Sequence, residues 1–221
     1  MSDLAARREE ERERRRAEIL AAAVGVCREQ GWDQVTMDQV ARRARLSRAL
    51  VYVYFRDRED LLDAIALQGT RELRERFVAA IATARRGIDR LQAIGLAYVA
   101  FSREQPHLFE ACSRFQIKTP AGAPSDAEQA CLKAHDEINA VMIGVIARGM
   151  DDGSIRRDLG DPTVVCMSLW AFTHGLIQLG ATRGRDLELR GIATATLFAQ
   201  SFDILRHALA TPAGLEPGTG A

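Results

Sequence analysis

The sequence predicts an all-α protein of about nine helices, with a three-helix head at the N-terminus and a larger helical body behind it. Apolar residues recur at intervals of three and four through most of the 221 residues, which is the periodicity of amphipathic helices. No stretch shows the strict alternation of a half-buried strand. Helix caps, prolines and glycines separate the helical runs, and 47% apolar with 27% charged residues is ordinary for a globular protein.

Residues 7–18 form a dense run of arginine and glutamate. Opposite charges four residues apart stabilise an exposed helix, so this run is interpreted as a solvated extension of the first helix. From about residue 14 the helix becomes well packed, because Ile19, Ala23 and Cys27 form one stripe. It is expected to end at Gly31, where a C′ glycine belongs.

Two short helices are predicted between Thr36 and Phe55. Thr36 is a suitable N-cap, and Gln39 three residues later completes a capping box. Ser47 can cap the second helix, because its hydroxyl accepts readily from a backbone N–H of the first turn. Two short helices joined by a turn of three or four residues form the helix-turn-helix unit, whose second helix can enter the major groove of DNA.

The second of these helices has a defined outer face. Val51 and Phe55 lie four residues apart on its inner stripe, which leaves Arg48, Ala49 and Tyr52 facing out. The region is also locally basic, with six arginines against two aspartates between residues 36 and 58. Such an excess suits DNA, because neutralising phosphates supplies much of the affinity. The zero net charge of the whole chain does not oppose this, since only the patch facing the groove must be basic.

The run from Ile19 to Leu61 resembles the DNA-binding domain of TetR-type (AcrR-like) transcriptional regulators. The chain departs from the family at Arg45 and Ala49, where glycine is usual. Arg45 implies either a turn conformation open to a side chain or some strain, and Ala49 alters the groove-facing surface. The matching pieces, in fixed register, are Ile19-Leu20-Ala21-Ala22, Gly31-Trp32, Val35-Thr36, Val40-Ala41, Ala44, Leu46-Ser47, Val51-Tyr52, Tyr54-Phe55 and Arg58-Glu59-Leu61.

The resemblance implies that this head contacts double-stranded DNA. Arg48, Ala49 and Leu50 are expected to face bases, with Arg48 reading guanine and the apolar pair touching thymine methyl groups. An alternative use of residues 1–13 is an arm that places Arg7 or Arg8 against phosphates or in the minor groove. The full set of predicted DNA-binding residues is Thr36, Arg45, Ser47, Arg48, Ala49, Leu50, Tyr52, Tyr54 and Arg58.

The body is expected to continue as helices connected by polar loops. Loops are predicted at the proline- and glycine-rich residues 119–125 and at the polar residues 154–160. The domains are therefore an arm at 1–13, a head at 14–58, a body at 59–210 and a disordered tail at 211–221. The body helices are predicted at 57–81, 88–102, 106–115, 127–150, 161–181 and 187–209, the fifth of them capped by Asp161 and Pro162.

The last two helices are more apolar than one subunit is expected to cover. One interpretation is the core of a monomer. The other, which the resemblance implies, is a homodimer whose subunits join these helices in a four-helix bundle, and two heads about 34–36 Å apart could then read successive major-groove faces. The predicted dimer interface consists of Leu169, Phe172, Leu176, Ile177, Leu197, Phe198, Ser201, Ile204 and Leu205.

The resemblance also implies a pocket for a small-molecule effector in the body. Trp170, His174 and Gln178 recur every four residues, so they share one helix face. An aromatic ring, an imidazole and an amide could orient a ligand in a largely apolar cavity. The alternative is core packing, with His174 bonded to a backbone carbonyl. The candidate ligand-binding residues are Phe101, Phe109, Cys112, Phe115, Met142, Met167, Trp170, His174 and Gln178.

Several functional classes find no support in the sequence. Histidines 107, 135, 174 and 207 lack His-x-x-x-His or Cys/His spacing, so neither a metal nor a cofactor is expected. The four cysteines form no CxxC pair and are interpreted as reduced thiols of a cytoplasmic protein, with thiol sensing through Cys112, Cys131 or Cys166 as an alternative. No apolar run is expected to reach the roughly 18 residues of a membrane span. Motifs such as GxSxG, the P-loop and HExxH are missing, so an enzyme is not expected.

The expected function is a ligand-responsive repressor that binds a pseudo-palindromic operator as a homodimer and is released by a small, lipophilic effector. An activator or dual regulator with the same head is one alternative. A ligand-binding or scaffold protein whose head has lost DNA binding is a second, which Arg45 and Ala49 keep open. A nucleoid-type binder without sequence preference is a third.

Overall fold

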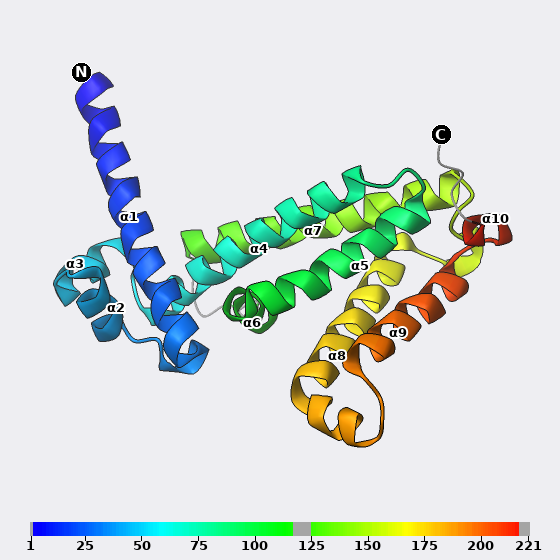
Figure 1. Cartoon of the computed structure of the whole chain (residues 1–221). Coiled ribbons are helices and arrows are strands. Elements are labelled where there is room, and N and C mark those ends of the chain that lie inside the picture. Colours follow the sequence, from blue (N-terminus) through cyan, green and yellow to red (C-terminus); the bar gives the residue numbers. More distant parts are fainter. Residues whose placement is uncertain (1, 117–124, 217–221) are drawn as a thin grey trace. The chain divides into compact units, whose positions relative to one another are not determined.

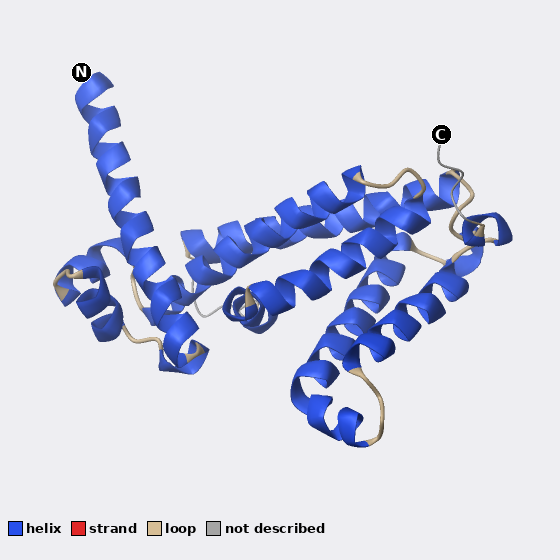
Figure 2. Cartoon of the chain, viewed as in Figure 1, coloured by secondary structure: helices blue, strands red, loops and turns tan. Residues whose placement is uncertain are grey.

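The computed structural model describes residues 2–116 and 125–216, and these are built of helices (Figures 1 and 2). The described ranges hold ten α-helices and two short 3-10 helices, and their one β-type pairing is an isolated bridge between Ile155 and Ala210. The all-α prediction is confirmed. The predicted loop at 119–125 lies outside the described residues apart from Ser125, which caps α7 through a 3.1 Å hydrogen bond from the N–H of Glu128.

The chain divides into two compact units. Unit 1 comprises Met1–Glu72 and Gln105–His135, and unit 2 comprises Leu73–Glu104 and Asp136–Ala221. The sequence places a single boundary near residue 58, whereas α4 and α7 each contribute residues to both units. Neighbouring parts of one long helix therefore belong to different units. A division of the sequence into consecutive ranges does not predict this.

Unit 1 contains the head. In it, Ile19, Val40, Val51 and Phe55 are fully buried, so the predicted inner stripes of its helices are confirmed. Gly31 follows α1 as predicted, and its φ of 88° with ψ of 164° is a conformation that favours glycine but is not the left-handed helical one of a usual C′ residue. The elements of unit 1 are α1 (Ser2–Gln30), η1 (Trp32–Gln34), α2 (Met37–Ala44), α3 (Arg48–Tyr54), the first part of α4 (Arg58–Ala82), α6 (Pro106–Arg114) and the first part of α7 (Asp126–Asp151).

The N-terminal turns of α1 extend beyond α2 and α3 (Figure 1). Residues 4–14 are exposed along this extension. Arg14 pairs with Glu11 at 2.6 Å and Arg15 with Glu18 at 2.7 Å, as expected for a charged helix in solvent. Each pair contributes little, because exposed ion pairs are typically worth about 0–1 kcal/mol. The solvated helix is thus observed, and a contact of Arg7 or Arg8 with DNA stays a prediction.

Unit 2 packs the ends of α4 and α7 with four further helices. Figure 1 shows α8 and α9 running side by side beneath α5. Phe101, Ile88, Ile94 and Ile146 are the largest fully buried side chains of this unit's helices. The elements not yet named are α5 (Gly87–Glu104), η2 (Arg157–Leu159), α8 (Pro162–Leu189), α9 (Thr194–Leu209) and α10 (Pro212–Leu215).

Helix α8 is longer than the sequence predicts. It begins as expected, with Asp161 accepting a 2.7 Å hydrogen bond from the N–H of Thr163, but it continues through the predicted turn at residues 182–186 to Leu189. An Arg183–Asp186 pair at 3.2 Å supports this extra segment. Gly184 costs a helix only about 1 kcal/mol, so it does not end one. The chain turns instead at Gly191, where φ is 72°.

Part of the predicted disordered tail is a short helix. Residues 212–215 form α10, capped by Thr211, whose hydroxyl accepts from the N–H of Gly214 at 3.0 Å. The rest of the predicted tail, residues 217–221, lies outside the described residues. Proline at the first position of the helix and threonine before it are the local signals that could have indicated this turn.

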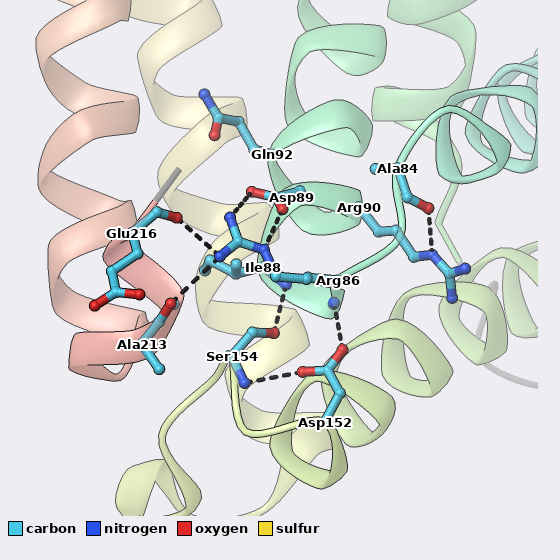
Figure 3. Close-up of polar contacts among 12 residues, drawn as sticks. Ala84, Arg86, Ile88, Asp89, Arg90, Gln92, Asp152, Ser154, Ala213 and Glu216 are labelled. Atoms are coloured by element: carbon cyan, nitrogen blue, oxygen red, sulfur yellow. Dashed lines mark hydrogen bonds and ion pairs between the residues drawn. The ribbon is translucent and has the colours of Figure 1, made fainter. Parts of the chain in front are cut away.

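Figure 3 shows the polar cluster that holds α10. Arg86 donates to Asp89 at 2.6 Å and to the carbonyl oxygens of Ala213 and Glu216 at 3.3 and 2.8 Å. Arg206 donates to the same Asp89 and to the carbonyl oxygen of Gly214, both at 2.9 Å. Burial alone would raise the pKa of Asp89, but the hydrogen bonds from the two arginines outweigh burial and lower that pKa.

The N-terminus of α5 is capped from the same cluster (Figure 3). Asp152 accepts from the N–H of Gly87 at 2.8 Å, and the hydroxyl of Ser154 accepts from the N–H of Ile88 at 3.1 Å. The backbone of Gly87 also lies so close to Gly149 on α7 that a Cβ on Gly87 would collide with it. Glycine is therefore required where α5 begins.

Among the described residues, α8 is the one helix long and apolar enough, by length and composition, to cross a membrane. One such helix is weak support for a membrane protein, because the core helix of a soluble protein passes the same test. The expectation that no apolar run reaches this length is nevertheless wrong. No charged residue stands between Asp161 and Arg183, and the polar side chains of Ser168, Thr173 and His174 interrupt the run without adding charge.

Gly87→Ala should destabilise unit 2, because the new methyl group must push α5 away from α7. Overpacking of this kind typically costs about 1–3 kcal/mol, which urea unfolding would report as a lower midpoint. Gly184→Ala is the matched control, since nothing lies within 4 Å of a Cβ there, and it should raise stability by up to about 1 kcal/mol. An unchanged midpoint for Gly87→Ala would show that the two helices are not in close contact.

Candidate functional site

The helix-turn-helix is held by the caps that the sequence predicts. The hydroxyl of Thr36 accepts from the N–H of Gln39 at 3.3 Å, and the amide oxygen of Gln39 accepts from the N–H of Thr36 at 3.0 Å. At the second helix, the hydroxyl of Ser47 accepts from the N–H of Leu50 at 3.2 Å. Both capping predictions are confirmed, and they set where α2 and α3 begin.

The turn between the two helices is made by Arg45. Its φ of 57° and ψ of 41° are left-handed, and among the described residues it is the one non-glycine with positive φ. The N–H of Leu46 then closes the turn onto the carbonyl of Ala41 at 2.9 Å. Of the two possibilities that the sequence left for Arg45, the structure shows the strained one, since this conformation costs an L-residue about 1–2 kcal/mol.

The outer face of α3 is open to solvent. Arg48, Ala49 and Tyr52 are exposed on it, and Leu50 and Tyr54 are half-buried. Of the remaining residues predicted to bind DNA, Thr36, Arg45 and Ser47 are exposed at the ends of α2 and α3. Val53, with 69% of its surface exposed, was not among the predicted DNA-binding residues.

Arg48, predicted to read a base, already has partners within the head. Its Nε lies 3.3 Å from a carboxylate oxygen of Asp38 on α2. One terminal nitrogen donates to the hydroxyl of Tyr52 at 3.3 Å, and the guanidinium carbon lies 5.5 Å from the centre of the Tyr52 ring. Asp38 was counted only as a charge in the sequence analysis, because its partner is ten residues away on the other helix.

Arg58 is turned toward the backbone of unit 1. Its guanidinium donates to the carbonyl oxygens of Val35 at 2.7 Å, Trp32 at 3.2 Å and Asp33 at 3.3 Å. These bonds tie the start of α4 to the η1 turn that precedes α2. The predicted contact of Arg58 with DNA remains a prediction, and the structure adds a role in holding the head together.

Unit 2 contains a small, mostly apolar cavity of about 50 Å³ that is partly open to solvent. Two residues predicted to bind a ligand, Met142 and Trp170, line it, and His174 lies beside it. The hydroxyl of Tyr98 is 3.0 Å from Nδ1 of His174, whose ring stacks on Trp170 with centroids 5.3 Å apart. The lining consists of Phe77, Ile88, Leu91, Gln92, Ile94, Gly95, Tyr98, Met142, Leu169, Trp170, Thr173, Phe202, Leu205, Arg206 and Leu209.

The other predicted pocket residues do not line this cavity. Phe101 is fully buried, with the guanidinium of Arg76 5.3 Å from its ring centre. Met167 and Gln178 are exposed on α8. Phe109, Cys112 and Phe115 belong to unit 1. Tyr98 was not among the predicted ligand-binding residues, because a hydroxyl within reach of an imidazole on another helix has no sequence signal.

Three of the four cysteines, Cys27, Cys112 and Cys166, are poor thiolate formers. Burial raises the pKa of Cys27 and of Cys112 to about 11, and burial also raises the pKa of Cys166. Protonated thiols react slowly, so nothing here favours thiol sensing. In the described part of the chain, no group of three or more His, Cys, Asp or Glu side chains is arranged to hold a metal ion.

Apolar side chains are exposed along α8 and α9. Of the predicted dimer interface, Phe172 and Ile204 are 41% and 55% exposed, and Leu197 and Leu205 are half-buried. Leu169, Leu176, Ile177, Phe198 and Ser201 are buried within the single chain. Further exposed apolar residues on or next to these helices are Val164, Met167, Trp170, Leu179, Leu189 and Ile192.

Two family models match the chain. The model described as bacterial regulatory proteins of the tetR family matches residues 19–65. The model described as the tetracyclin repressor-like C-terminal domain matches residues 91–205, more than half of the chain. The chain belongs to the TetR family of bacterial regulatory proteins. It is therefore a transcriptional regulator with a helix-turn-helix DNA-binding domain and a ligand-binding C-terminal domain.

The chain is also similar to one curated protein and to several solved structures. The HTH-type transcriptional regulator HbdR of Aromatoleum sp. (strain CIB) is 44% identical over 50 residues, which cover 23% of this chain and 22% of that protein. A protein of unknown function from Rhodococcus sp. RHA1 has a solved structure with 26% identity and a TM-score of 0.72, covering 89% of this chain and 96% of its own. FadR from Bacillus subtilis, solved in complex with stearoyl-CoA, shares the fold with 16% identity and a TM-score of 0.66, covering 90% and 99%.

Arg45→Gly should stabilise the head. Glycine adopts the left-handed backbone without strain, which should raise the free energy of unfolding by about 1–2 kcal/mol. Glycine also makes the unfolded chain more flexible, which lowers that free energy by about 0.4–1 kcal/mol. A net gain of about 0.5–1 kcal/mol should raise the urea midpoint. Arg45→Ala keeps the strain and should leave the midpoint near that of the unaltered protein. A lower midpoint for Arg45→Gly would contradict the left-handed turn.

The unfolding free energy should fall as pH drops below about 6.5, the ordinary pKa of histidine. Burial lowers the pKa of His174, and burial with the charge of Arg28 lowers that of His107. The unfolded chain then binds protons before the native state does, so stability is complete above pH 6.5 and is lost below it. His174→Asn should reduce this slope in urea unfolding measured from pH 7.5 to 5.5, and replacing both histidines should reduce it further. An unchanged slope in His174→Asn would refute the assignment.

Proposed function

We propose that this TetR-family regulator is a repressor that binds a pseudo-palindromic operator as a homodimer and is released by a small, lipophilic effector. The observation that carries the proposal is the open face of α3, where Arg48, Ala49 and Tyr52 are exposed on a helix fixed by its buried stripe. The left-handed turn at Arg45 supports a working head, because it provides the backbone path that glycine provides in relatives. Arg48 reads guanine, and Ala49 and Leu50 contact thymine methyl groups.

The homodimer is supported by the exposed apolar side chains of α8 and α9. A soluble monomer rarely leaves so many large apolar side chains in water, and a two-fold partner would bury the same surface on both chains. Phe172 and Ile204 lie in this surface, on α8 and α9 respectively. Two joined subunits can place two recognition helices on successive turns of the major groove.

The lipophilic effector is supported by the lining of the cavity in unit 2. Its walls are mostly apolar, with Tyr98, Thr173 and the nearby His174 as polar groups able to orient a ligand. A cavity of about 50 Å³ is smaller than the roughly 300 Å³ of the smallest usual ligand sites, so an effector must widen it. Phe77 lines the cavity from α4, the same helix that begins at Arg58 in the head. An effector that binds the widened state more tightly would shift the population away from the DNA-bound form.

As a repressor without a chemical step, the protein is not an enzyme and acts in the cytoplasm, where its operator lies. Membership of a family of transcription regulators supports both statements.

Two arginine variants test the assignment of DNA contacts. A duplex that binds the dimer is first selected from a random library, with the region upstream of the gene as a second probe. Arg48→Ala should cost about 1–3 kcal/mol at one base position and relax preference there. Arg45→Ala should weaken binding to all duplexes about equally. It should also reduce the slope of log affinity against log salt concentration by about one. Equal loss on every sequence from Arg48→Ala would contradict base reading, and a protein that selects no duplex would overturn the repressor proposal.

A further inference from the structure

Asp38 is the one acidic residue between Thr36 and Phe55, the helix-turn-helix itself. It lies in the first turn of α2, and its side chain is 56% exposed. An acid in this position interacts favourably with the helix dipole, which is a sufficient reason for it in an isolated helix. On a surface that must approach phosphates, however, a carboxylate lowers the affinity for any DNA.

The carboxylate of Asp38 faces Arg48. Oδ1 of Asp38 is 3.3 Å from Nε of Arg48, and Oδ2 accepts from a terminal nitrogen of Arg48 at 3.4 Å. From the other side, the hydroxyl of Tyr52 accepts from the second terminal nitrogen at 3.3 Å, and the Tyr52 ring lies 5.5 Å from the guanidinium carbon. The guanidinium is therefore held between α2 and the next turn of α3.

These contacts are too exposed to matter for stability. Exposed ion pairs contribute little to stability because water screens them, and the Arg48 and Asp38 side chains are 59% and 56% exposed. Their effect is on orientation, because they restrict the rotamers of a flexible side chain before DNA binds. A guanidinium has five N–H groups, so Asp38 and Tyr52 leave others for an outside acceptor.

We propose that Asp38 is a positioning residue for base reading, which orients Arg48 toward a base edge and keeps it from phosphates. The inference rests on the proposed function. A carboxylate beside Arg48 cancels much of its attraction to phosphate, the contact that every DNA sequence offers. The neutral acceptor pair of guanine, O6 and N7, keeps its value as a bidentate partner. Asp38 therefore lowers affinity for all DNA while it raises the difference between right and wrong sequences.

The test compares two probes, a duplex selected from a random library by the unaltered dimer and a shuffled duplex of the same composition. Asp38→Asn and Asp38→Ala should bind the shuffled duplex more tightly, because one negative charge is lost. Their ratio of affinities for selected over shuffled duplex should fall several-fold, with the loss concentrated at the base position that Arg48→Ala identifies. In an Arg48→Ala background, Asp38→Ala should leave the base preference unchanged.

Glu29→Gln is the matched control for charge. Glu29 is an exposed acid of the same head, paired with Arg43 at 2.6 Å and not with Arg48. This variant should strengthen binding to both duplexes by the same factor and keep the ratio. Circular dichroism of each variant would show that α2 remains folded, so that a change in the ratio cannot come from loss of the head.

Three outcomes would overturn the inference. If Asp38→Asn behaves as Glu29→Gln does, Asp38 acts only through its charge. If Asp38→Ala alters base preference even without Arg48, Asp38 contacts a base itself and does not position Arg48. If the unaltered dimer selects no duplex, the proposed function fails and this inference fails with it. If the dimer does select a duplex but the Asp38 variants keep the same ratio of affinities, only this inference fails.

Discussion

The head depends on the burial of one stripe of α3. Val51 and Phe55 are wholly inside unit 1, where the guanidinium of Arg16 also lies 4.9 Å from the Phe55 ring centre. Because a helix has only one rotation that buries both residues, the same packing decides that Arg48 and Tyr52 point outward. The cap that Ser47 forms fixes the residue at which α3 begins. The rotation of α3 and its starting position are therefore both determined before any DNA is present.

The elements that the sequence predicts well are those with local chemical signals. The caps at Thr36, Ser47 and Asp161 hold as predicted, because each depends on residues two or three positions apart. The end of α8 was predicted too early, since a glycine in a polar run resembles a turn but costs little within a helix. The predicted domain boundary near residue 58 differs from the division into two compact units, because α4 and α7 each contribute residues to both.

The candidate sites follow the same rule. The open face of α3 could be predicted because Val51 and Phe55, four residues apart in one short helix, define the opposite, buried side. Only Met142 and Trp170 of the residues that line the cavity were predicted from the sequence. The others could not be predicted because five helices contribute to its walls. The contacts of Asp38 with Arg48 and of Tyr98 with His174 join side chains far apart in sequence. Neither has a motif, and only the packing of helices brings them together.

The cluster around Arg86 makes residues 213–216 part of the fold of unit 2. Carbonyl oxygens of Ala213, Gly214 and Glu216 are the acceptors for Arg86 and Arg206, and Arg206 also lines the cavity. A shortened protein that stops before Thr211 would leave the guanidinium groups of Arg86 and Arg206 without these carbonyl acceptors, beside the cavity of unit 2. Purification tags and fluorescent fusions should therefore be attached after Glu216. They should not replace residues 211–216.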